Sequence, residues 1–164
     1  MKQRQSPRAV PCGFTMIELL VVMAVLGILA AAVLPLGETL LVSQKERELR
    51  AALLEIRQAL DEHRRLALRD SQVAASGASG YPATLQVLVD GIAVRQADGA
   101  QATARFLRRI PRDPFADPAL PAEQTWRLRS YASPANRPAP GADVYDIHSS
   151  SDGVALDGTK YAAW

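Results

Sequence analysis

The chain has 164 residues, a formal net charge of +2 and 22% charged residues, so its charge gives no reason to expect a basic face that binds nucleic acid. It contains a single cysteine, Cys12, and only 5% aromatic residues, which excludes an intrachain disulfide and predicts a small hydrophobic core. The sequence has no Cys-x-x-Cys, HExxH or glycine-rich phosphate-binding motif, so it lacks the signatures of the enzymes that depend on them. We expect a protein that is not an enzyme.

The N-terminal part combines a basic segment with a long apolar run. Residues 1–13 carry three basic residues and no acidic one, and an uncharged run of 19 residues extends from Leu19 to Gly37. A helix rises about 1.5 Å per residue, so this run comes close to the ~30 Å hydrocarbon core of a bilayer. Basic residues that precede a membrane helix stay in the cytoplasm. The pattern predicts a single membrane helix over residues 14–37, with the C-terminal part outside the cytoplasm.

A short motif opens this run: Gly13-Phe14-Thr15-Met16-Ile17-Glu18. Together with the apolar residues as far as Pro35, it resembles the N-terminal signal of type IV prepilins and of type II secretion pseudopilins. The resemblance implies that residues 1–13 are a leader peptide, that a prepilin peptidase cleaves after Gly13, and that the new amine of Phe14 is methylated. The mature chain would then contain no cysteine, and its formal charge would be −1.

Glu18 is the only charged residue between the basic segment and Glu38. A charge inside a membrane segment is costly, so we interpret Glu18 as functional. The resemblance implies that it pairs with the N-terminal amine of a neighbouring subunit during filament assembly and sets the axial register. The alternative is an ordinary secretory signal peptide that is cleaved near Ala30-Ala31-Ala32, in which Glu18 has no function.

The helical pattern continues beyond the apolar run. Pro35 predicts a kink or a local opening of the helix, not its end. An amphipathic helix is predicted over residues 38–76, because apolar residues recur at spacings of three, four and seven and charged residues occupy the rest of the helix. The whole helix is expected from about Thr15 to about Ala75. A coiled coil is the alternative, although the apolar stripe is short for one. The stripe consists of Leu49, Leu53, Ile56, Leu60 and Ala67.

Residues 77–164 are expected to form a small α+β domain that packs on this stripe. After a linker of small residues, the spacing of Leu85, Leu88, Val89 and Ile92 predicts a short helix over Ala83–Gly91. A further turn of helix is expected within Gly99–Leu107. The segment from Arg109 to Phe115 is expected to be extended, because it contains two prolines that lie three residues apart.

Two strands are predicted near the C-terminus from alternating patterns, one over Trp126–Tyr131 and one over Val144–His148. The proline-rich stretch between them, from Pro134 to Gly141, is expected to be a loop. Two or three short antiparallel strands are not stable alone in water, so they need the apolar stripe of the long helix beneath them. The sequence thus predicts the α+β class, and the resemblance implies the pilin-like fold.

The order of the motifs in the C-terminal domain narrows the resemblance to the major pseudopilins of type II secretion. The matching segments are Tyr81-Pro82, a short helix that contains Gln86 and Leu88, and Ile110-Pro111-Arg112-Asp113-Pro114. The chain departs from that pattern where Phe115 replaces the usual Trp and Ala116-Asp117-Pro118 replaces Gly-Asn-Pro.

The segment from Ser149 to Thr159 contains two Asp-Gly pairs in a loop that is rich in serine. Hard oxygen ligands on a sharply turning backbone suit Ca²⁺, but Asp-Gly is also a common turn dipeptide, so both interpretations stay open. Major pseudopilins carry a calcium ion in the matching loop. By position, the resemblance implies the ligands Asp152 and Asp157, the carbonyl of Ser150, and Thr159. The loop is about one residue shorter than in those proteins.

His63 and His148 are not expected to be catalytic, because no oxyanion-hole motif accompanies the sequence His148-Ser149 and adjacent residues of a strand point to opposite faces. The resemblance implies a structural subunit of the type II secretion pseudopilus. Its partners would be other pseudopilins, the prepilin peptidase, the inner-membrane assembly platform, the outer-membrane secretin and the exported proteins. The alternatives are a minor pseudopilin, a type IV pilin for adhesion, motility or DNA uptake, and a membrane-tethered periplasmic protein.

Overall fold

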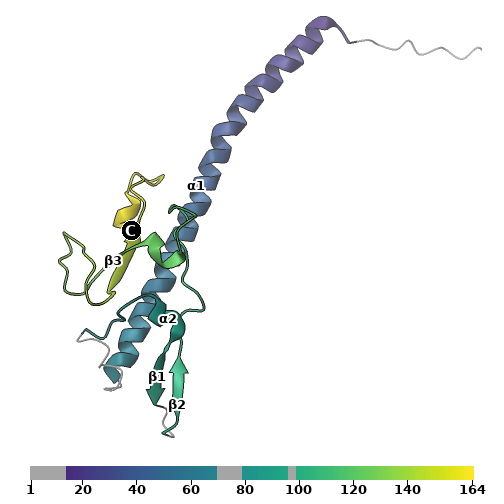
Figure 1. Cartoon of the computed structure of the whole chain (residues 1–164). Coiled ribbons are helices and arrows are strands. Elements are labelled where there is room, and N and C mark those ends of the chain that lie inside the picture. The colour runs from purple at the N-terminus through teal and green to yellow at the C-terminus, as the bar shows by residue number, and fades with distance from the viewer. Residues whose placement is uncertain (1–13, 70–78, 96–98) are drawn as a thin grey trace, which may run out of the picture. The chain divides into compact units, whose positions relative to one another are not determined.

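The computed structural model describes residues 14–69, 79–95 and 99–164, with the main chain alone for residues 32–36. It has a long N-terminal helix followed by small antiparallel sheets, which is the α+β class predicted from the sequence and is consistent with a pilin-like fold (Figure 1). The chain divides into two compact units, Met1–Leu41 and Val42–Trp164. Each unit is described separately.

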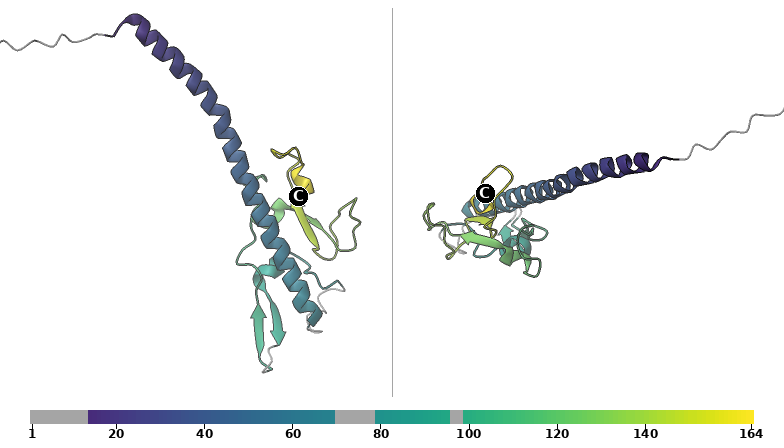
Figure 2. Two further views of the ribbon diagram at one scale, coloured as in Figure 1. Left: turned by 180° about the vertical axis from the view of Figure 1, so that it is seen from behind. Right: turned by 90° about the horizontal axis from the view of Figure 1, so that it is seen from above.

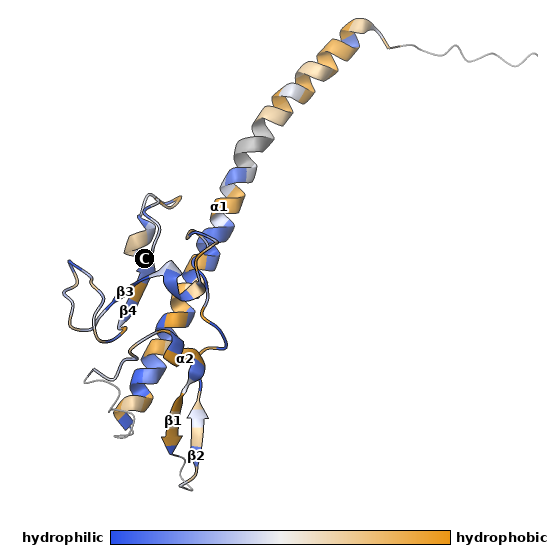
Figure 3. Ribbon diagram, viewed as in Figure 1, coloured by the Kyte–Doolittle hydropathy of each residue, from blue (hydrophilic) through white to orange (hydrophobic). Residues whose placement is uncertain are grey.

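Helix α1 spans Met16–Arg69 and contributes to both units. It runs through Pro35 without ending, as expected, and the kink predicted at this residue stays a prediction. Residues 70–75, the predicted last part of the helix, lie outside the described residues. In the first unit the helix is apolar around most of its circumference, whereas its later turns alternate between polar and apolar residues (Figure 3). Within the described residues, no helix combines the length and the apolar character that a membrane crossing requires.

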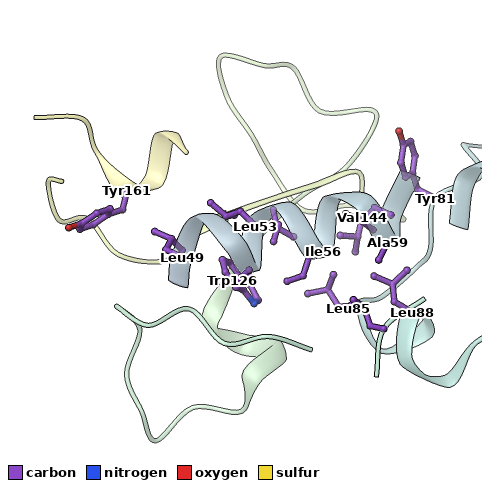
Figure 4. Close-up of a cluster of buried hydrophobic side chains, with 14 of the residues drawn as sticks. Leu49, Leu53, Ile56, Ala59, Tyr81, Leu85, Leu88, Trp126, Val144 and Tyr161 are labelled. Carbon is purple, nitrogen blue, oxygen red and sulfur yellow. The ribbon is translucent and has the colours of Figure 1, made fainter. Parts of the chain in front are cut away.

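In the second unit, α1 forms the floor of the hydrophobic core. All five residues of the predicted stripe are at most 3% exposed, so this prediction is confirmed. Figure 4 shows Leu49, Leu53 and Ile56 pointing from the helix toward side chains of later segments. Two polar residues, Glu46 and His63, are also buried in line with the stripe. They complete a sequence of positions that alternates steps of three and four residues, the period of a coiled-coil seam. The positions are Glu46, Leu49, Leu53, Ile56, Leu60, His63 and Ala67.

Helix α2, Gln86–Asp90, is shorter than predicted. Leu85 and Leu88 are buried in the core, which confirms that this segment packs on the long helix. The helix ends at Gly91, whose φ of 86° is favourable only for glycine, and a Cβ there would lie 2.5 Å from the carbonyl oxygen of Ala104. The helical spacing that begins at Leu85 therefore does not continue to Ile92, because the chain turns at Gly91 and Ile92 begins a strand.

Strands β1, Ile92–Arg95, and β2, Gln101–Ala104, form an antiparallel hairpin in which Ile92 pairs with Ala104. The helical turn predicted within Gly99–Leu107 is thus wrong. Its alanine, glutamine and arginine residues have good helix propensity, but pairing with β1 provides the backbone hydrogen bonds instead. Immediately after β2, the amides of Phe106 and Leu107 both donate to the carbonyl of Leu88, at 2.9 Å each, and attach this segment to α2.

Of the segment predicted to be extended, Arg109 to Phe115, residues 110–113 form neither helix nor strand, in agreement with the prediction. Its end is not extended, because Pro114 and Phe115 lie in a turn that the amide of Ala116 closes on the carbonyl of Asp113 at 3.2 Å. A short 3₁₀ helix, η2, spans Ala122–Thr125. The two predicted strands near the C-terminus are confirmed with slightly different bounds. They are β3, Trp126–Arg129, and β4, Asp146–Ser149, and they pair antiparallel with Trp126 opposite Ser149. Buried Trp126 and Ile147 pack on the α1 stripe, as expected for short strands that are not stable alone.

The segment between β3 and β4 contains no helix or strand, as its prolines predicted. The chain closes with a 3₁₀ helix, η3, over Tyr161–Ala163. In the two views of Figure 2, the last residues lie beside β3 and β4 and close to α1. Tyr161 stacks on Phe115, with ring centroids 4.1 Å apart, so the C-terminal turn joins the segment between β2 and β3 to the core.

Candidate functional site

The N-terminal motif begins with a helix cap. The amide of Glu18 donates to the side-chain oxygen of Thr15 at 3.3 Å and to its carbonyl at 3.1 Å, and the amide of Leu19 donates to the same carbonyl at 3.3 Å. Thr15 and Glu18 are three residues apart, which is the sequence signature of a capping box. The carboxylate of Glu18 lies in the first turn of α1, where the helix dipole favours a negative charge. Thr15 therefore fixes where the helix begins, which the sequence analysis did not recognise.

The structure describes two of the three residues predicted to act in processing and assembly. Phe14 and Glu18 are both described and exposed, whereas Gly13, and with it the predicted cleavage site, lies outside the described residues. Phe14 precedes the first turn of α1 and its side chain is 76% exposed. Phe14 and Glu18, which are predicted to pair between neighbouring subunits, are thus both accessible in the isolated chain.

The described apolar side chains beside Glu18 and in the turns after it are mostly exposed. Eleven large hydrophobic residues from Met16 to Leu29 are between 47% and 80% exposed. Burial of apolar surface contributes roughly 25 cal/mol per Å², so a long exposed apolar helix gains much from lipid or from a partner protein. These eleven are Met16, Ile17, Leu19, Leu20, Val21, Val22, Met23, Val25, Leu26, Ile28 and Leu29.

The second predicted site is the loop that follows β4. Asp157 closes a tight turn, because its Oδ1 accepts hydrogen bonds from the amide of Thr159 at 2.9 Å and from its hydroxyl at 2.6 Å. Gly158 occupies this turn with a φ of 85°. The side-chain and main-chain hydrogen bonds from Thr159 hold the pKa of Asp157 below its ordinary value. The second Asp-Gly pair is therefore a turn, one of the two interpretations that the sequence left open.

The first Asp-Gly pair has a different partner. Oδ1 of Asp152 accepts a hydrogen bond from Arg127 of β3 at 2.9 Å. Both predicted carboxylate ligands are thus already bound by protein donors, and among the residues that the structure describes no group of three or more Asp, Glu, His or Cys side chains could hold a metal ion. In this arrangement Oδ1 of each carboxylate accepts from a protein donor and is not open to an ion, so the donor set fits calcium poorly.

Two buried carboxylates that the sequence analysis did not single out hold this loop from outside. Asp113, 2% exposed, accepts hydrogen bonds from the hydroxyl of Ser149 at 2.6 Å and from the amide of Ser150 at 3.1 Å. Glu46, 4% exposed, accepts hydrogen bonds from the amide of Leu156 at 2.7 Å and from the hydroxyl of Tyr161 at 3.2 Å. The position of Glu46 in line with the apolar stripe was the sequence signal for its burial.

A third carboxylate, Asp143, joins two loops. It accepts hydrogen bonds from the hydroxyls of Ser79 and Ser130 and from the amide of Tyr131. Burial acts to raise the pKa of Asp143, but these three hydrogen bonds outweigh it and lower the pKa below its ordinary value. Asp143 therefore connects the turn before Tyr81 to the loop between β3 and β4.

The two histidines lie in different surroundings. His63 is 1% exposed and its Nδ1 lies 3.0 Å from the carbonyl oxygen of Gly80, while its Nε2 has no hydrogen-bond partner among the described residues. Burial lowers the pKa of His63 more than the bond to Gly80 raises it. His148 Nε2 is 3.7 Å from Asp146, but the hydroxyl of Ser149 donates to Asp113. The three residues therefore do not form a Ser-His-Asp relay.

A groove of about 1610 Å³ runs beside α1 in the second unit. Acidic residues of α1, including Glu55 and Asp61, line one wall, and arginines of the segment after β2, including Arg108 and Arg109, line another. None of these four side chains has an ion-pair partner within 4.0 Å among the described residues. Because the groove presents both signs of charge, it gives no preference for an anionic or a cationic ligand.

Comparison with known proteins bears on the N-terminal motif. A family model, the prokaryotic N-terminal methylation motif, matches residues 11–34. This motif is the type IV pilin-like prepilin signal, and it indicates a type IV pilin-like or pseudopilin-like protein. Neither the curated proteins nor the solved structures contain a match to the chain.

Proposed function

We propose that this chain is a structural subunit of a type II secretion pseudopilus, which polymerises in the periplasm and drives protein export through the outer membrane. The methylation motif at residues 11–34 carries the proposal, because it joins a capped helix start and Glu18 to a long apolar helix. The exposed apolar side chains of that helix support it, since they would be buried first in lipid and then among the helices of neighbouring subunits.

In this proposal, residues 1–13 remain in the cytoplasm until a prepilin peptidase cleaves after Gly13 and Phe14 is methylated. The carboxylate of Glu18 then pairs with the amine of Phe14 of a neighbouring subunit. An unpaired charge between packed apolar helices costs several kcal/mol, so only the register that pairs these groups is favourable. The domain of residues 42–164 forms the outer surface of the filament, where it would contact the secretin and the exported proteins.

A minor pseudopilin or a type IV pilin is the second candidate. The observation in its favour is that Asp152 and Asp157 are bound by Arg127 and Thr159, since the resemblance to the major pseudopilins implies that these two carboxylates bind calcium. The two candidates share cleavage, methylation and polymerisation, and they differ in the assembly that the subunit joins.

Processing is tested by co-expressing the full chain with a prepilin peptidase and determining the mass of the purified protein. We expect loss of residues 1–13 and addition of one methyl group at Phe14. Gly13→Leu should leave the precursor intact in the membrane fraction. A mature-size product from this variant would mean that another protease acts, as an ordinary signal peptide requires.

Assembly is tested with Glu18→Ala, and Glu38→Ala is the matched control because it removes the same charge from an exposed position outside the motif. Glu18→Ala should be cleaved normally and yet should not enter filaments alongside wild-type subunits, as measured by shearing and immunoblotting. Glu38→Ala should assemble. Normal filaments from Glu18→Ala would refute the role of Glu18 as the register charge.

A further inference from the structure

The loop between β4 and η3, residues 150–160, is fastened at both ends by carboxylates of other segments. At its start, Asp113 binds the hydroxyl of Ser149 and the amide of Ser150, and further on Glu46 of α1 binds the amide of Leu156 and the hydroxyl of Tyr161. The loop itself contributes Asp152 and Asp157. Four carboxylates thus hold this loop or belong to it, and two arginines bring positive charge to them.

Arg127 supplies the first positive charge. It extends from β3 and binds Asp152 at 2.9 Å, with half of its side chain exposed. Its position on the strand is fixed, because β3 pairs with β4 in a register that places Arg127 opposite His148. The pairing of β3 with β4 therefore holds the guanidinium group beside the first Asp-Gly pair.

Arg50 of α1 supplies the second positive charge. Its guanidinium nitrogen lies 3.6 Å from Glu46 and 4.0 Å from Asp157, so it connects the buried carboxylate to the second Asp-Gly pair. The same group lies 4.1 Å from the centroid of the Trp164 ring, a cation–π contact with the last residue. Arg50 is thereby held over the end of the loop.

We propose that Arg50 and Arg127 together replace a divalent cation in this loop. Two guanidinium groups carry the same charge as one Ca²⁺. Arg127 donates to Asp152 at 2.9 Å and Arg50 lies 4.0 Å from Asp157, and these are the two carboxylates that the resemblance to the major pseudopilins assigns to calcium. The loop closes on α1 through protein groups alone, and the second unit reaches its full stability without a bound metal ion. This inference concerns the folding of the domain and does not depend on the proposed function.

The experiment uses the full chain in detergent micelles and measures its melting temperature in EDTA, in millimolar Ca²⁺ and in millimolar Mg²⁺. We expect the same melting temperature for the wild type in all three solutions. In EDTA, R50Q/R127Q should melt several degrees lower, and hydrogen exchange in residues 150–161 should be faster, because the carboxylates are no longer neutralised. Both arginine side chains are about half exposed, so the substitutions leave the core intact.

The matched control is R108Q/R109Q, which removes the same two charges from exposed positions without an ion pair in the described residues. It should melt close to the wild type and keep the slow exchange of residues 150–161. A rise in the wild-type melting temperature that is specific to Ca²⁺ would overturn the proposal. So would an R50Q/R127Q variant that is as stable and as protected from exchange as the control.

Discussion

Isoleucines of the same helix are exposed in one unit of the chain and buried in the other. Ile28 in the first unit is 72% exposed, whereas Ile56 in the second is completely buried. In the first unit apolar residues surround the helix, so no single face is available for a compact domain to cover. In the second unit they form a single stripe with charged residues around it. The comparison teaches that the period of the pattern, and not its apolar content, decides which part of the helix packs within its own chain.

The sharpest test of this comparison exchanges the two isoleucines for alanine. Ile56→Ala should lower the free energy of unfolding by about 2–5 kcal/mol, because it leaves a cavity in a packed core. Ile28→Ala is the matched control and should leave that free energy unchanged within about 0.5 kcal/mol. Urea unfolding of the full chain in detergent, followed by tryptophan fluorescence, measures both values. Equal losses from the two variants would mean that Ile28 is also packed within the chain.

The next largest effect is expected at Asp113, which is buried together with one of its hydrogen-bond partners, Ser149. Asp113→Ala should cost about 2–3 kcal/mol, because the hydroxyl of Ser149 and the amides of Ser150 and Phe115 lose a charged acceptor. Asp61→Ala removes a carboxylate from an exposed position of α1 and serves as the control. The same urea titration distinguishes them, and an Asp113→Ala variant as stable as the control would contradict the structural role of Asp113.

A smaller effect should follow a change in pH. The pKa of His63 is lowered by burial, so the folded state favours the neutral imidazole and the unfolded state binds the proton more readily. Its contribution to stability is therefore complete above the unfolded pKa of about 6.5 and is lost as the pH falls through the lower folded pKa. The pKa of His148 is lowered in the same direction, first by burial, so it has the same sign.

Melting temperatures between pH 7.5 and pH 5 test this dependence. The wild type should become less stable across this range, and His63→Gln should reduce the slope because glutamine can still donate to the carbonyl of Gly80 and does not titrate. His148→Gln separates the contribution of the second histidine. If His63→Gln has the same slope as the wild type, the buried imidazole is not the source of the effect.

Local patterns in the sequence were sufficient for several elements. The 3.5-residue period from Leu49 to Ala67 predicted the buried face of α1, and the alternation around Trp126 and Ile147 predicted β3 and β4. These predictions succeeded because each pattern repeats one spacing over several residues, and only one secondary structure places such residues on a common face. The motif from Gly13 to Glu18 is likewise local, and the match to the methylation motif rests on the same residues.

Other features depended on contacts between segments that are distant in the sequence. The strand β2 forms because β1 lies beside it, although its residues favour a helix. The hydrogen-bond partners of two carboxylates could not be predicted from the sequence either. Arg127 lies 25 residues from Asp152, and Tyr161 lies 115 residues from Glu46. The sequence by itself determined the class of the fold, the N-terminal signal and the packed face of α1. Only the tertiary structure decided which charges meet, because an ion pair or a buried hydrogen bond requires two groups to be within about 4 Å, and no local pattern encodes that distance.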